Sequence, residues 1–229
     1  MKKLEKGTSA EKSLRKAVGL LRRELKAKNE LREKMLAESR RITRVSKEAT
    51  TLIFQGRIPK AKAGLKKAGK MIRRLMRKLE EAPELRHSGA LSAACQEFAE
   101  AFILLALEER GTCPTLEEVK VDLGSYILGL ADVPGELRRG VLTALLNHDV
   151  EGAERRFRVM EAIYNELTAL NEQAFHVLPG LRRKCDVIRH LLELTASEVV
   201  LERRQQRLEE ALRRSERRLS SETFKEKPA

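Results

Sequence analysis

The chain of 229 residues has few aromatic residues (3%), no tryptophan, only six prolines and only thirteen glycines. Turns between strands draw on glycine and proline, so this shortage argues against an all-β protein and against a low-complexity chain. The three cysteines, Cys95, Cys113 and Cys185, are odd in number and far apart. They fit neither a disulfide framework nor a zinc cluster, so we expect a reducing, cytoplasmic setting.

Long apolar segments are also missing. No run of 18 apolar residues occurs, so the sequence predicts no transmembrane helix. The N-terminal residues lead into charged, helix-like sequence instead of the apolar core of a signal peptide. The length allows one large or two small domains.

Charge, in contrast, is abundant: 35% of the residues are charged, against about 25% in an ordinary domain. The formal net charge of +13 is uneven, because residues 1–80 hold 26 Lys and Arg against 8 Glu (+18), whereas residues 81–229 hold 21 basic against 26 acidic residues (−5). One stretch holds ten basic residues and no acid: Arg57, Lys60, Lys62, Lys66, Lys67, Lys70, Arg73, Arg74, Arg77 and Lys78. Such a stretch indicates a polyanionic partner, because each phosphate contact releases counterions. A solvated helix face and an acidic membrane surface are the alternatives.

Apolar residues recur at three- and four-residue spacing along most of the chain, as amphipathic helices require. Capping boxes at Thr8–Glu11 and Thr115–Glu118 mark two helix starts, and Gly56, Gly111 and Pro179-Gly180 mark breaks. The pattern predicts an all-α fold with seven helices, at about residues 8–54, 58–82, 84–110, 115–123, 125–147, 150–175 and 181–219. We expect one domain over residues 1–219, followed by a disordered tail at 220–229. Helices this long and amphipathic also favour association with further copies of the chain.

Two pairs of acids are the candidates for chemistry. Glu97 and Glu100 are three residues apart, so both carboxylates project from one helix face. Asp132 and Glu136 share a face if the helix continues through Pro134; alternatively, Asp132 caps a helix that begins at Pro134. Four such carboxylates suit Mg²⁺, which takes a few carboxylates together with water and phosphate oxygens. Acid pairs at this spacing are also common on solvated faces, but these lie in mostly apolar stretches.

Other types of site find little support in the sequence. The four histidines have no ligand spacing, and no Glu-x-x-His motif of a ferritin-like di-iron site occurs. No Ser-His-Asp or Cys-His arrangement is evident. Arg182, Arg183 and Lys184 follow a helix start, where they fit either a phosphate contact or a solvated turn.

Four stretches resemble the translin family, which contains translin and translin-associated factor X. They occupy residues 31–47, 96–101, 126–139 and 179–189, and the most specific is Tyr-Ile-Leu-Gly-Leu-Ala-Asp-Val-Pro-Gly-Glu-Leu-Arg-Arg at 126–139. The resemblance implies a seven-helix translin-like subunit in a closed, hollow octamer that binds single-stranded RNA and DNA on a basic inner surface. Members with nuclease activity carry two glutamates in one motif and an aspartate and a glutamate in another. Glu97, Glu100, Asp132 and Glu136 match these positions, while Pro134 departs from the expected pattern.

The leading hypothesis is therefore a homo-oligomeric, metal-dependent endoribonuclease that acts on single-stranded RNA, with Mg²⁺, or Mn²⁺ in its place, held by the four acids. The alternatives are a catalytically silent scaffold that binds single-stranded RNA or DNA, as translin does, and a membrane-surface or adaptor protein. The residues expected to contact nucleic acid are Arg57, Lys60, Lys66, Lys67, Lys70, Arg73, Arg74, Arg77, Arg139, Arg182, Arg183 and Lys184.

Overall fold

The computed structural model describes residues 8–86, 88–174 and 177–223, and within these ranges the chain is helical, without a strand. The all-α class that the sequence predicts is confirmed, and seven of the described α-helices have eight residues or more. They are not the same seven, because the helix expected at 115–123 is a single turn at Leu116–Val119 and the one expected at 125–147 is divided in two. The elements are α1 (Ser9–Phe54), α2 (Ile58–Lys78), two 3₁₀ turns (Leu79–Glu81 and Pro83–Leu85), α3 (Gly89–Arg110), the one-turn α4 (Leu116–Val119), α5 (Leu123–Leu130), α6 (Val133–Leu146), α7 (Val150–Ala174) and α8 (Gly180–Thr223).

Several helix ends lie where the sequence predicts them. The Thr8 hydroxyl accepts from the Glu11 amide, and the Glu11 carboxylate accepts from the Thr8 amide, which completes the capping box of α1. Thr115 and Glu118 form the same box at α4. Gly111 ends α3 in the left-handed region at φ +67°, a conformation that costs glycine little.

Other boundaries differ from the prediction. The helix expected from residue 84 begins only at Gly89, because a 3₁₀ turn occupies Pro83–Leu85. The second helix ends at Lys78 and continues as a 3₁₀ turn. The last helix runs to Thr223, four residues past its expected end, and the remainder of the expected tail lies outside the described residues.

The helix expected at 125–147 is divided into α5 and α6. Pro134 is the second residue of α6, where its missing N–H costs nothing, whereas inside a continuous helix its ring would clash with the carbonyl of residue 130. Asp132 occupies the N-cap position of α6, as one of the two sequence interpretations proposed, but its side chain makes no capping hydrogen bond. The carboxylate is therefore available for contacts with other elements.

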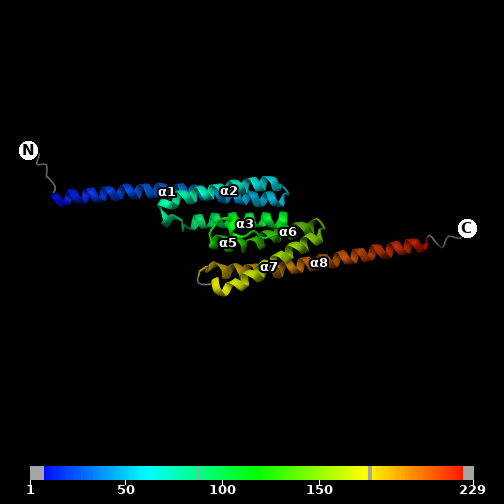
Figure 1. Ribbon diagram of the computed structural model, residues 1–229. Helices are drawn as coiled ribbons and strands as arrows, with labels where there is room; N and C mark the ends of the chain where they lie inside the picture. Colours follow the sequence, from blue (N-terminus) through cyan, green and yellow to red (C-terminus); the bar gives the residue numbers. More distant parts are fainter. Residues whose placement is uncertain (1–7, 87, 175–176, 224–229) are drawn as a thin grey trace, which may run out of the picture.

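The helices pack in layers around α3 (Figure 1). α1 packs against α2 and α3, α3 against α5 and α6, and α7 joins α6 to α8. By length and composition α3 is apolar enough to cross a membrane, but 56% of its apolar window is buried and ten of its residues belong to the core. We therefore interpret α3 as the central core helix. The first half of α1 and the last part of α8 extend beyond this packed body at opposite ends (Figure 1).

Candidate active site

The four predicted acids line one pocket of about 560 Å³. α1, α3 and α6 supply its walls, with Asp132 in the short link before α6. The lining residues are Lys47, Thr50, Thr51, Glu97, Glu100, Asp132, Glu136 and Arg139. The division of the predicted helix does not separate Asp132 from Glu136, because both lie within the first turn of α6 or next to it.

A close approach between α5 and α3 brings the two acid pairs together. A Cβ atom at Gly129 would lie 2.7 Å from the carbonyl oxygen of Gln96 and 2.8 Å from the Cβ of Ala99. Only glycine therefore lets α5 pack directly on the α3 backbone at this point. Three residues after Gly129, Asp132 Oδ2 accepts a hydrogen bond of 2.5 Å from the Gln96 side-chain amide. This hydrogen bond fixes the Asp132 carboxylate beside the α3 glutamates.

Three of the acids are paired with cations. Lys47 Nζ on α1 lies 3.1 Å from Glu97 Oε1, and Arg139 Nη1 lies 2.9 Å from Glu136 Oε2. Lys184 on α8 forms an ion pair with Asp132. The Arg139 guanidinium also lies over the Phe54 ring, 5.3 Å from its centroid, so packing holds this side chain as well as charge.

Glu100 differs from the other three acids, because it has no hydrogen-bond or ion-pair partner among the described residues. Burial raises the pKa of its carboxyl to about 8, and the negative charges of Asp132, Glu97 and Glu136 add to this rise, while Lys184 opposes it. Glu100 is therefore mostly protonated at neutral pH. The pocket thus holds more carboxylates than its own cations neutralise.

The acids face one another without being arranged as ligands. In the part of the chain that the structure describes, no three carboxylate, imidazole or thiol side chains stand close enough to hold a metal ion. Their chemistry nevertheless fits a hard divalent cation, since all four side chains offer oxygen donors, and burial together with the neighbouring negative charges raises the pKa of Glu100. Binding would require Lys47, Lys184 and Arg139 to release their carboxylates.

The predicted nucleic-acid contacts are spread over several surfaces. All ten basic residues from Arg57 to Lys78 are exposed, but none lines the acid pocket. Three of them, Lys67, Arg74 and Lys78, line a groove of about 250 Å³ between α1 and α2. Of the other predicted contacts, Arg139 and Lys184 reach the acids, whereas Arg182 and Arg183 are exposed at the start of α8.

Sequence reasoning did not single out four residues at this site: Lys47, Thr50, Thr51 and Gln96. Gln96 directly precedes Glu97, and Lys47 ends the 31–47 stretch, so both had a local signal. Thr50 and Thr51 had none, because only the packing of α1 on α3 places them at the acids.

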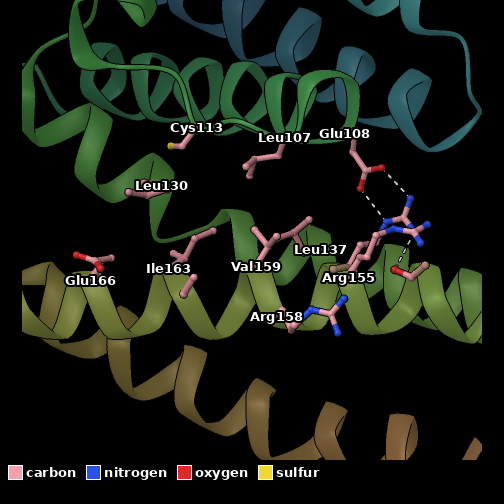
Figure 2. A pocket seen from close by; sticks show the side chains of 14 residues that line it. Leu107, Glu108, Cys113, Leu130, Leu137, Arg155, Arg158, Val159, Ile163 and Glu166 are labelled. Atoms are coloured by element: carbon pink, nitrogen blue, oxygen red, sulfur yellow. Dashed lines mark hydrogen bonds and ion pairs between the residues drawn. The ribbon is translucent and has the colours of Figure 1, made fainter. Parts of the chain in front are cut away.

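A second pocket, of about 820 Å³, lies between α7 and the α3 and α6 layers (Figure 2). Leu107, Leu130, Leu137, Val159 and Ile163 form its apolar walls. At one end Arg156 binds Glu108 through two hydrogen bonds of 2.7 Å. None of the four clustered acids lines this mostly apolar pocket, so the acid pocket is the better candidate for phosphate chemistry.

Comparison with known proteins gives the family. A model of the translin family matches residues 30–195, which include both acid pairs and the first turns of α8. The chain belongs to the translin family. A curated relative, an uncharacterized protein of Methanocaldococcus jannaschii, is 37% identical over 204 residues, which cover 85% of this chain and 86% of that protein.

Three solved structures of C3PO proteins have the same fold as this chain. AfC3PO is 29% identical to this chain, with a TM-score of 0.72 over 82% of this chain and 97% of its own. AfC3PO in complex with duplex RNA gives a TM-score of 0.74 over 82% and 96%. Apo-NeC3PO has the same fold at 20% identity, with a TM-score of 0.73 over 81% and 96%.

Proposed function

We propose that this translin-family protein binds RNA and cuts its phosphodiester bonds with Mg²⁺ at the acid pocket, within an assembly of identical subunits. One observation carries the proposal: two acid pairs, 32 or more positions apart in sequence, line a single pocket. The solved complex of AfC3PO with duplex RNA supports RNA as the nucleic acid.

The acids would hold the metal, with Glu97 and Glu100 binding from α3, and Asp132 and Glu136 from the start of α6. When bound, Mg²⁺ would lower the pKa of a water molecule and offset the charge on the attacked phosphate. Mn²⁺ accepts the same oxygen donors and is expected to substitute. Gln96 would keep the Asp132 carboxylate in place through its hydrogen bond.

Two cations at the pocket would bind the RNA backbone. The Lys47 and Arg139 side chains are 63% and 61% exposed, so each can exchange its carboxylate partner for a phosphate. Arg139 is the better oriented, because its stacking on Phe54 limits its freedom and its planar guanidinium suits phosphate oxygens. We expect it to stabilise the charge that develops on the phosphate during attack. The exposed residues from Arg57 to Lys78 would attract the strand over a longer range.

Cleavage of labelled RNA by the purified protein tests the proposal. Single-stranded and duplex RNA are each incubated with Mg²⁺, with Mn²⁺, or with a chelator, using wild type and Glu97→Gln in parallel. We expect cleavage that requires the metal and is lost in the variant. Equal cleavage by wild type and variant would refute the metal site.

A nucleic-acid-binding scaffold without catalysis is the second candidate, and the ion pairs at the pocket favour it. Lys47, Lys184 and Arg139 already neutralise three of the acids, and no three donors are yet close enough for a metal. The same experiment distinguishes the two functions. RNA that is bound but not cut at any metal concentration would identify a scaffold.

The assembly and its setting are also proposed. Family resemblance suggests a homo-octamer, and light scattering on the pure protein should then give a mass near eight times 26.0 kDa. Single-stranded DNA should compete for the RNA-binding surface, since its phosphates offer the same contacts. The three free cysteines are consistent with a cytoplasmic protein.

A further inference from the structure

Two parts of the molecule are helices that extend beyond the packed body (Figure 1). The second of them still touches the body at its base, where Arg203 Nε lies 3.4 Å from Glu154 Oε1 of α7 and His148 Nδ1 lies 3.5 Å from Glu202 Oε1. We call residues 9–27 of α1 the α1 arm and residues 200–217 of α8 the α8 arm. The first buried residue of α1 is Met35, and the last buried residue of α8, over the part up to residue 217 whose burial is described, is Val199. The two arms extend from opposite ends of the body, so they cannot pair within one chain. Both arms also lie outside the residues that match the family model.

Each arm carries an exposed apolar seam. On the α1 arm, Leu14, Val18, Leu21 and Leu25 are 44–67% exposed and follow alternating spacings of four and three residues. On the α8 arm, the corresponding positions are Leu201, Gln205, Leu208 and Leu212, and the leucines are 56–68% exposed. Alternating spacings of three and four are the signature of a coiled-coil seam. An isolated helix gains nothing from such a seam in water, so each arm needs a partner.

The two seams match when the arms run antiparallel. If Val18 lies opposite Leu208, then Leu14 lies opposite Leu212 and Leu25 opposite Leu201. Leu21 then meets Gln205, a polar core residue of the kind that fixes register at some cost in stability. The three apolar layers would span about 16 Å of helix.

The charges that flank the seams are complementary in that same register. Arg15 and Arg22, on one flank of the α1 arm, lie opposite Glu209 and Glu202 of the α8 arm. On the other flank Glu24 lies opposite Arg204. Neither Arg15 nor Arg22 has an ion pair among the described residues. Two α1 arms paired antiparallel would instead bring Arg15 against Arg22, which is repulsive.

We propose that the α1 arm of one copy forms an antiparallel coiled coil with the α8 arm of a neighbouring copy, in the register that places Val18 opposite Leu208. The interface is head-to-tail, because it uses two different surfaces, and such an interface builds a ring where the rotation between copies closes and an open filament where it does not. The proposal deepens the assembly part of the proposed function, and it is independent of the chemistry at the acid pocket.

Charge reversal tests the pairing. The full chain is compared by light scattering over a range of concentrations as wild type, as Arg15→Glu/Arg22→Glu, as Glu202→Arg/Glu209→Arg, and with all four changes. Each double variant should raise the concentration needed for assembly by at least about tenfold, and the fourfold variant should restore it. Lys16→Glu/Arg23→Glu is the matched control, because it makes the same charge change on the outer face of the α1 arm.

Disulfide trapping tests the register of the two arms directly. It also tests their pairing if the charge reversals are too weak to change the assembly mass measured by light scattering. In a Cys113→Ser background, Val18→Cys/Leu208→Cys should yield covalent multimers on mild oxidation, whereas Leu20→Cys/Leu208→Cys should not, since Leu20 lies off the seam. Failure of the Val18 pair to cross-link in an assembled protein would refute the arm pairing alone. A wild-type protein that stays monomeric would refute the proposed assembly as well, and neither result would depend on RNA cleavage.

Discussion

Replacing Glu100 by glutamine should make the metal-free protein more stable, and the gain should grow with pH. The folded-state pKa of this carboxyl is raised to about 8, from an ordinary value of 4.5. The folded protein therefore holds a proton that the unfolded chain releases between pH 4.5 and 8. The contribution of the Glu100 carboxyl to the unfolding free energy of wild type is therefore most favourable below pH 4.5. This contribution is lost as the pH rises towards 8.

The size of the effect follows from the shift. One pKa unit corresponds to about 1.4 kcal/mol, so the group costs the folded state roughly 3 kcal/mol at pH 7 relative to acid pH. A glutamine side chain has nearly the same shape as the Glu100 side chain but does not ionise. The difference in unfolding free energy between Glu100→Gln and wild type should therefore rise by about 1.4 kcal/mol per pH unit across this window.

Urea unfolding followed by helical circular dichroism, at fixed protein concentration and at half-unit steps from pH 5 to 8, measures this difference. Glu161→Gln, on the exposed face of α7, controls for the amide substitution itself. Saturating Mg²⁺ should remove the pH-dependent loss in wild type, because it binds only the folded, deprotonated pocket. A stability difference that stays constant within about 0.5 kcal/mol from pH 5 to 8 would show that Glu100 is already ionised and that the acids do not repel as described.

Three further results are expected. Asp132→Asn should abolish cleavage and most of the Mg²⁺-dependent rise in melting temperature, while RNA affinity stays nearly unchanged. Melting, cleavage and binding assays on one preparation of the variant will check these three results. RNA affinity should fall with salt at a log–log slope of roughly −0.7 per phosphate contacted, and Arg73→Ala/Arg74→Ala should flatten that slope; an unchanged slope would place the binding surface elsewhere. Gly129→Ala should cost about 1–3 kcal/mol of stability and slow cleavage, because its Cβ would lie 2.7 Å from a backbone oxygen of α3. Gly135→Ala, with no atom within 4 Å, should leave cleavage unchanged and raise stability slightly, since alanine favours the helix over glycine.

The sequence alone determined the helical class, most of the helix starts and the identity of the four acids. These features depend on neighbours in the chain: capping boxes at Thr8 and Thr115 satisfy amides three residues away, and Glu97 and Glu100 share a face because they are one turn apart. The family resemblance that short stretches of sequence indicated was confirmed by the match to the translin family over residues 30–195.

Only the tertiary structure decided how Pro134 affects the acids and which cations accompany them. The proline divides the expected helix, yet Gly129 lets α5 approach α3 so closely that Asp132 still reaches the α3 glutamates. Lys47 and Lys184 lie more than 130 residues apart in the chain. Charge patterning pointed instead to the Arg57–Lys78 stretch, none of which lines the pocket. Local spacing fixes which side chains share one helix face, but which faces meet depends on how closely the backbones pack, and a sequence read one helix at a time does not contain that distance.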